Sequence, residues 1–221
     1  MNRMRPYPTA LFAALGLAAV VGSITIAQPS KESKPEGQKE MKLPPGWTEE
    51  DMKACMEAGT PGKMHEHLAR GVGAWRGKAT MWMAPGADPV TNQSTASVTP
   101  ILDGRFTRWE YKGEMPGAGP YSGYGIQGFD NVSQKFVSVW LDNYGTGIMN
   151  GTGEISPDGK SITWTYTYNC PINHRPTTMR EIETTTGDNT KTLEMFGIEP
   201  KSGKEYKMMN IELTRSAGGA Q

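Results

Sequence analysis

The residues that could carry chemistry in this chain are one pair of opposite charges set among aromatic side chains. Arg105, Trp109 and Tyr111 alternate along one run, and Trp140 and Asp142 alternate along another. A carboxylate and a guanidinium among aromatic rings would suit a small-molecule site, which is mostly apolar with a few fixed polar groups. The same charges could serve a hydrolase or isomerase, with Asp142 as the base. A structural ion pair that fixes strand register is the third alternative.

The three histidines do not form a recognisable site. His65 and His67 are two residues apart on a predicted helix, so their rings face different sides and indicate a solvated helix face or lid. A zinc site would need a third ligand, and His174 on its loop would alternatively ligate haem. No nucleophile elbow, phosphate loop or zinc-protease signature occurs, so we predict no catalytic residue, metal or cofactor. Glu181 and Glu183 are interpreted as solvent-face charges on a strand.

The candidate residues lie in a series of β-patterned runs that begins at Gly73-Ala74-Trp75. Period-two alternation between turn residues predicts about ten strands, near 74–83, 93–101, 104–113, 121–129, 135–142, 147–155, 161–168, 177–185, 190–198 and 204–215. Ten strands are too many for one flat sheet, and no parallel crossover helix is present. We therefore expect an all-β fold, an antiparallel meander closed into a barrel. Arg215 in the last strand is expected to lie over Trp75 in the first.

Two short helices are expected before the barrel. Thr48 is a predicted N-cap with Asp51 at the third position, and a second helix is expected over 63–71. In a barrel protein, such a helix would plug or lid an open end.

The lining of the barrel is predicted from alternation. In the run 163–168, threonines take one face and aromatic residues the other, which we assign to the interior. In the run 136–142 the face opposite Trp140 is purely aliphatic, so periodicity leaves open which face fills the lumen. The predicted ligand-binding residues are Arg105, Trp109, Tyr124, Trp140, Asp142, Trp164 and Tyr166. Core packing is the alternative for each tryptophan.

The N-terminal segment has the composition of an export signal. Basic residues precede an apolar run over 10–27 that ends in small residues, which predicts a signal peptide over 1–27, cleaved before Gln28. An uncleaved membrane anchor is the alternative. Residues 28–46 are polar and alternate in charge, as in a disordered tether, and 47–217 suit a single barrel domain with an N-terminal helical lid. We expect a secreted or periplasmic protein with no membrane contact after cleavage.

Charge and cysteine content restrict the partners. The 23 basic and 23 acidic residues balance, and no basic block lies outside the signal, so nucleic-acid binding is disfavoured. Cys55 and Cys170 are the only cysteines, and in an exported chain they are either bridged or two separate thiols.

Several segments together resemble the bacterial family called domain of unknown function 1579. They are Pro61-Gly62 with His65 and Leu68 ahead of Gly73-Ala74-Trp75, then the segments 101–106, 123–131 and 136–142. The Gly-x-Trp entry to the first strand is similar to that of lipocalin-like barrels. The resemblance implies a calycin-like barrel in an exported protein and brings no activity with it. The sequence thus favours a barrel that binds a small hydrophobic or amphipathic molecule. The alternatives are the enzyme above and an envelope interaction module.

Overall fold

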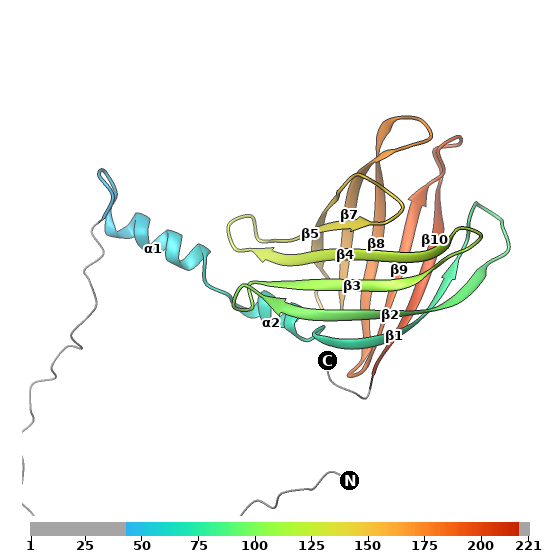
Figure 1. Ribbon diagram of the computed structural model, residues 1–221. Helices are drawn as coiled ribbons and strands as arrows, with labels where there is room; N and C mark the ends of the chain where they lie inside the picture. Colours follow the sequence, from blue (N-terminus) through green and yellow to red (C-terminus); the bar gives the residue numbers. More distant parts are fainter. Residues whose placement is uncertain (1–42, 217–221) are drawn as a thin grey trace, which may run out of the picture. The chain divides into compact units, whose positions relative to one another are not determined.

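The computed structural model describes residues 43–216, so the predicted signal peptide and residues 28–42 of the predicted tether lie outside the described residues. Two helices, α1 (Glu49–Ala58) and α2 (Lys63–Ala69), precede ten strands (Figure 1). The strands are β1 (Gly73–Met81), β2 (Val90–Ile101), β3 (Phe106–Met115), β4 (Gly119–Asp130), β5 (Lys135–Asp142), β6 (Met149–Ile155), β7 (Ser161–Cys170), β8 (Arg175–Gly187), β9 (Thr190–Ile198) and β10 (Glu205–Arg215). No helix within 43–216 is long and apolar enough to span a membrane.

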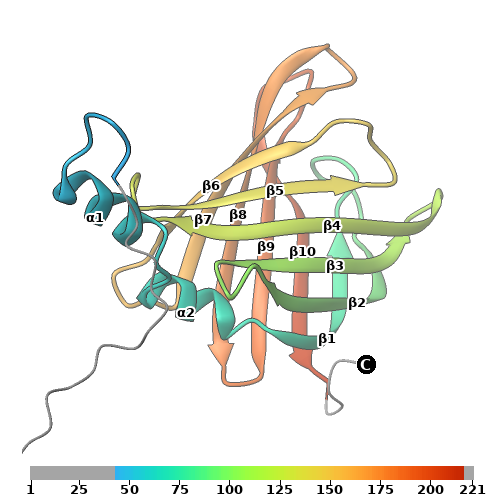
Figure 2. The same cartoon turned by 60° about the vertical axis from the view of Figure 1, so that its left-hand side comes forward.

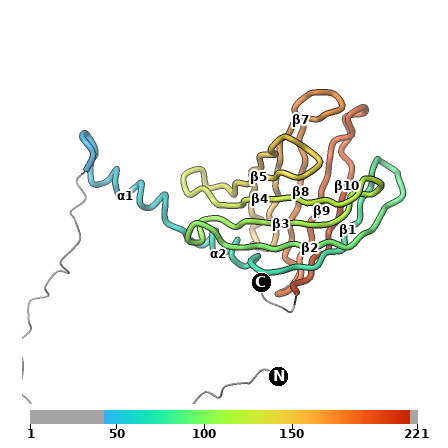
Figure 3. Tube along the Cα trace, in the orientation of Figure 1, coloured from blue at the N-terminus to red at the C-terminus, as the bar shows by residue number. Residues whose placement is uncertain are grey.

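The predicted all-β meander barrel is confirmed. Every strand pairs antiparallel with its neighbour in the chain, and β1 also pairs with β10, which closes the sheet. Strands β2–β5 run across the direction of β8–β10 on the other side of the barrel (Figures 1 and 2). The tube in Figure 3 follows the chain back and forth, so that successive turns alternate between the two ends of the barrel.

One end of the barrel is filled by α2 and a cluster of buried side chains. Leu68 of α2 packs with Phe136, Ile162 and Trp164, and Trp164 has no exposed surface. The helix α1 begins with the expected capping box, in which Thr48 and Asp51 bond reciprocally, but none of its residues is buried. The C-terminal end of α1 is tied to the barrel by two side chains. The Asn131 amide donates to carbonyl oxygens of residues 58 and 60, and Arg105 donates to that of residue 59.

The two cysteines are free and occupy different parts of the molecule. Cys55 is exposed on α1, which is attached at the end filled by α2. Cys170 is buried at the last position of β7, in the turn to β8 at the opposite end of the barrel. Of the two alternatives for the cysteines, the structure therefore has two separate thiols.

Trp75 and Arg215 join the first strand to the last, as expected. They are direct cross-strand partners, and the Arg215 guanidinium carbon lies 4.3 Å from the centroid of the Trp75 ring. The Arg215 guanidinium also donates to the carbonyl oxygens of Arg70 and Val72, and the Trp75 indole nitrogen donates to the Gly71 carbonyl at 2.9 Å. These contacts satisfy carbonyls at the end of α2 and fix the helix against the seam.

Replacing Trp75 tests this closure. Trp75 is 2 % exposed, so Trp75→Ala should lower the free energy of unfolding by about 3–5 kcal/mol, as buried tryptophan-to-alanine changes do. Trp75→Phe should cost much less because it keeps most of the packing. Trp47→Ala is the matched control, since Trp47 is 43 % exposed. Guanidinium unfolding curves measure all three, and equal losses for Trp75→Ala and Trp47→Ala would contradict the role of Trp75.

Candidate functional site

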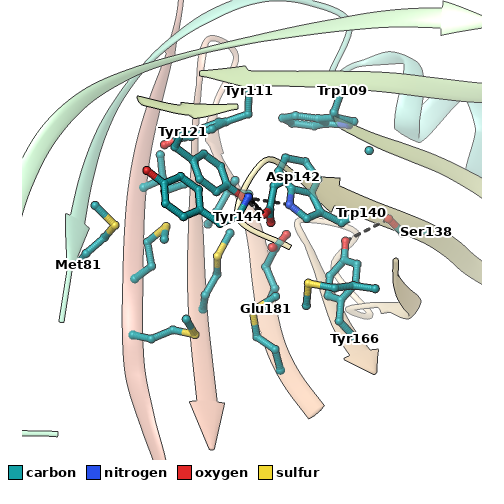
Figure 4. A pocket seen from close by; sticks show the side chains of 18 of the residues that line it. Met81, Trp109, Tyr111, Tyr121, Ser138, Trp140, Asp142, Tyr144, Tyr166 and Glu181 are labelled. Atoms are coloured by element: carbon teal, nitrogen blue, oxygen red, sulfur yellow. Dashed lines mark hydrogen bonds between the residues drawn. The ribbon is translucent and has the colours of Figure 1, made fainter. Parts of the chain in front are cut away.

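A cavity of about 300 Å³ lies inside the barrel, toward the end opposite α2 (Figure 4). Its rim is formed where β3 and β5 end and β4 and β6 begin, at Met115, Asp142, Tyr121 and Met149. This volume is at the lower bound of the range for small-molecule sites. The lumen is therefore neither packed solid nor an open channel.

Methionine is the commonest residue type in the wall of the cavity. Seven of the 14 methionines in the chain line it: Met81, Met115, Met149, Met179, Met195, Met208 and Met209. The unbranched thioether side chain is flexible and polarizable, and it fills irregular space against ligands of different shape. The wall of the cavity is therefore mostly apolar and flexible.

Asp142 is held at the rim by a chain of hydrogen bonds. The Trp140 indole nitrogen donates to the Tyr121 hydroxyl at 3.1 Å, and that hydroxyl donates to the Asp142 carboxylate at 3.1 Å. The backbone N–H of Tyr144 donates to the other carboxylate oxygen at 2.8 Å, and the Tyr144 ring stacks on Tyr121. Burial, with the Asp142 charge, raises the pKa of Tyr121 far above its usual range. The phenol thus stays a donor, and Asp142 is a fixed acceptor (Figure 4).

The Trp140 ring lies flat against the backbone of β4. Gly123 and Gly125 are the cross-strand partners of Asp142 and Trp140. A Cβ atom at Gly125 would come within 2.8 Å of the Trp140 ring, and one at Gly123 would come closer still. One face of the indole is therefore covered by glycine backbone, and the ring forms part of the cavity wall. Tyr166 packs on Gly151 of β6 in the same way.

Two buried hydrogen bonds fix further rings in the lining. The Trp109 indole nitrogen donates to the Gln127 side-chain oxygen at 2.9 Å. The Tyr166 hydroxyl donates to Ser138 at 3.1 Å. All four side chains are buried, and a buried polar atom without a hydrogen-bond partner lowers stability, so these bonds stabilise the arrangement of the rings. The protein's own hydrogen bonds therefore fix the positions of both rings.

Two carboxyl groups of β8 face the interior, so their assignment to the solvent face was wrong. Glu183 pairs with Lys191 of β9 at 2.6 Å, and both side chains are nearly buried. Glu181 is 7 % exposed and lines the cavity. Burial, and secondly the charge of Glu183, raise the pKa of Glu181 to about 8, so it is largely protonated at neutral pH. The sequence does contain a signal for this: residues 179, 181 and 183 alternate along β8, so both carboxyl groups lie on the same face as Met179.

Of the predicted ligand-binding residues, four line the cavity: Trp109, Trp140, Asp142 and Tyr166. Trp164 lies in the cluster under α2, so the core-packing alternative holds for this tryptophan. Tyr124 was wrongly placed: it is 47 % exposed on the outer face of β4, opposite Leu141, because the glycines at 123 and 125 take the inner positions.

Arg105 is also wrongly placed in the predicted site. It precedes β3 in the turn at the α2 end and donates to the Gly59 carbonyl at 3.1 Å. Phe106, the residue after Arg105, pairs with Gly128, and Asp142 pairs with Gly123, so these two positions are five residues, or about 16 Å, apart along β4 at about 3.3 Å per residue. Neither the structural ion pair nor a catalytic pair of Asp142 with Arg105 forms.

His65 of α2 is 7 % exposed, so it does not lie on a solvated helix face. The His65 Nδ1 accepts the Gly62 N–H at 3.0 Å, and its ring packs edge-on against Phe129. Within residues 43–216, no three side chains of the His, Cys, Asp or Glu type are grouped as metal ligands.

Comparisons with known proteins identify the family and the fold. The family described as "Protein of unknown function (DUF1579)" matches residues 60–215. The S-type phycobiliprotein lyase CPES from Guillardia theta has a similar structure, with a TM-score of 0.54 and 12 % identity over 74 % of this chain and 97 % of the lyase. Rv2717c from M. tuberculosis has a TM-score of 0.51 and 14 % identity over 71 % and 99 % of the two chains. At these identities the likeness shows the fold alone. No curated protein sequence matches the chain.

The buried Glu181 carboxyl predicts a pH dependence of stability. Below about pH 4.5 the group is protonated in both states, and between about 4.5 and 8 it ionises in the unfolded chain alone, so the folded state loses stability as the pH rises. Glu181→Gln removes this loss. The stability difference between variant and parent should grow by roughly 4 kcal/mol across that window. Urea unfolding at several pH values measures it, and parallel profiles would refute a buried, neutral Glu181.

The glycine contact under Trp140 gives a second prediction. Gly125→Ala should force the indole into the cavity and lower stability by about 1–3 kcal/mol, as overpacking does. Gly147→Ala is the matched control, because a Cβ there meets no atom within 4 Å. Chemical unfolding and near-ultraviolet circular dichroism report stability and ring environment. Identical behaviour of the two variants would mean that the ring does not rest on β4.

Proposed function

For this chain, which belongs to the DUF1579 family, we propose that the barrel lumen binds a small amphipathic molecule. The observation that carries the proposal is the cavity of about 300 Å³, which remains in an otherwise packed barrel. Sites for small molecules combine an apolar wall with a few placed polar groups. The methionines and rings supply the wall here, and Asp142 and Glu181 supply the polar groups.

The positions of the polar groups determine how a ligand would lie. Asp142 is at the rim and Glu181 deeper, among Tyr166 and the methionines of β8 and β9. A ligand with one polar end would direct it toward these two groups and bury its apolar body against the thioethers. A barrel fold shared with a phycobiliprotein lyase is consistent with ligand binding.

The other two classes of function have less support. The enzyme alternative rested on Arg105 acting with Asp142, and these residues lie at opposite ends of the barrel. The interaction module was expected to combine a barrel packed solid with an apolar patch outside. An outer patch is present, where Tyr124, Ile126 and Leu141 are exposed on β4 and β5, but the lumen holds a cavity.

Filling the lumen tests the proposed function. A panel of lipophilic amines, acids and alcohols is titrated calorimetrically into the parent protein, and Met195→Trp should then abolish the heat of any ligand that binds, because the larger ring occupies the cavity. Met209→Trp fills the same space from β10. Met83→Trp is the matched control, since Met83 is 55 % exposed and outside the lining. No binding by the parent, or undiminished binding by both filled variants, would overturn the proposal.

We also propose that the protein is exported through its N-terminal segment. The support is the sequence of basic, apolar and small residues over 1–27. N-terminal sequencing of protein recovered from the periplasm or medium of a bacterial host should begin at Gln28. Protein retained in the cytoplasm with Met1 intact would contradict export.

A further inference from the structure

We propose that the ligand of the lumen is an organic cation, an ammonium group on an aromatic or aliphatic body, with its charge in the part of the cavity that Asp142 and Glu181 face. This inference rests on the proposed binding function and names the class of ligand. Three features of the lining carry it: the sign of its charges, one carboxyl group without a partner, and aromatic rings that no side-chain cation of the described residues covers.

Every charged residue in the lining is acidic. These residues are Glu114, Asp142, Glu181 and Glu183, and within residues 43–216 no lysine, arginine or histidine lines the cavity. Glu183 is neutralised by Lys191, and Glu114 lies at the exposed rim. An anionic ligand would therefore meet carboxylates without a counter-charge, whereas a cation would meet two groups that can accept its hydrogen bonds or balance its charge.

Glu181 is the carboxyl group without a partner. It is more than nine-tenths buried, and it forms no hydrogen bond or ion pair within residues 43–216. In Figure 4 its side chain points from β8 into the cavity, on the side of Asp142. A buried carboxyl group is costly unless it is paired or neutral, so the protein alone holds it mainly as the acid. A cation beside it would provide the missing partner.

The groups that face Glu181 explain why the protein itself does not supply this partner. Glu183 lies on the same strand, Lys191 on β9 and Tyr166 on β7, and Asp142 lies on β5 at the rim. Lys191 is the only cation among them, and it is committed to Glu183 at 2.6 Å. When Glu181 is ionised, no cation among these described residues is therefore left to balance its charge.

The rings supply the second mode of cation recognition. At the inner end, the Lys191 ammonium already lies 5.1 Å from the Trp75 ring centroid and 5.2 Å from that of Trp109. No side-chain cation of the described residues covers Tyr121, Trp140 or Tyr144, which surround Asp142. An ammonium group placed over an aromatic face is attracted by the ring quadrupole, most strongly where water is excluded.

Three probes that share a naphthalene body separate charge from hydrophobicity. They are 2-naphthylmethyl-trimethylammonium, 2-naphthylmethanol and 2-naphthylacetate, titrated calorimetrically into the full-length protein at pH 8.5. We expect the cation to bind at least about tenfold more tightly than the alcohol, and the anion to bind most weakly. Equal binding of cation and alcohol would overturn the cation inference and leave lumen binding intact. Binding of none of the three probes would count against both.

Glu181→Gln and Asp142→Asn test the named carboxyl groups. Each should weaken the cation about tenfold or more at pH 8.5 and change the alcohol less than about twofold, because only the charged partner loses its counter-charge. Glu154→Gln is the matched control, since Glu154 is exposed on the outer face of β6. Loss of alcohol binding in step with cation binding would indicate a general disturbance of the cavity and would overturn the assignment.

The pH dependence of the affinity for the permanently charged probe distinguishes a binding role of Glu181 from a purely structural one. Because burial raises the pKa of Glu181 to about 8, a cation that binds beside it must displace its proton below that pH. The affinity of the trimethylammonium probe should therefore rise with pH up to about 8 and level off above. In Glu181→Gln the profile should be flat through this window. A flat profile in the parent would overturn the role of Glu181.

Discussion

The stacking of the Arg215 guanidinium on the buried Trp75 ring is the interaction on which the barrel depends. A meander of ten strands has two edges until β1 meets β10, and these two residues are partners in that final pairing. The same guanidinium donates hydrogen bonds to carbonyl oxygens at the end of α2, where the last carbonyl groups of a helix have no partner within the helix. The same side chain therefore contributes to the closure of the sheet and to the attachment of α2 at one end. These contacts do not involve the opposite end of the barrel, where the cavity lies.

Toward that opposite end, glycine positions leave a cavity inside the barrel. Large rings normally fill a small barrel, but Trp140 and Tyr166 lie along the wall because glycines on the neighbouring strands offer no Cβ to hold them away. The rings are then locked by hydrogen bonds to Tyr121 and Ser138. The size of the cavity is thus determined as much by positions without a side chain as by those that line it.

The sequence was sufficient for the architecture and only partly sufficient for the site. Turn residues and period two gave the ten strands, and the Thr-aromatic alternation in β7 placed Tyr166 inward correctly. The predictions for Arg105 and Tyr124 were wrong because each residue was assigned from its chemistry and not from its position in the strand. Arg105 lies in a turn. Tyr124 alternates with Gly123 and Gly125, which take the inward positions and have no side chain that would indicate the inner face. Glu181 was missed because hydropathy places a carboxyl group outside, whereas β8 carries two of them inside next to Lys191 of β9.

The methionine wall gives the cavity a redox chemistry of its own. Oxidation of a thioether to the sulfoxide turns a flexible apolar side chain into a polar, chiral one, and enzymatic reduction reverses it. Seven such sulfur atoms line a single space, so each oxidation would place a strong hydrogen-bond acceptor where an apolar ligand body should lie. If the lumen binds a ligand as proposed, oxidation of these methionines would lower its affinity for an apolar body.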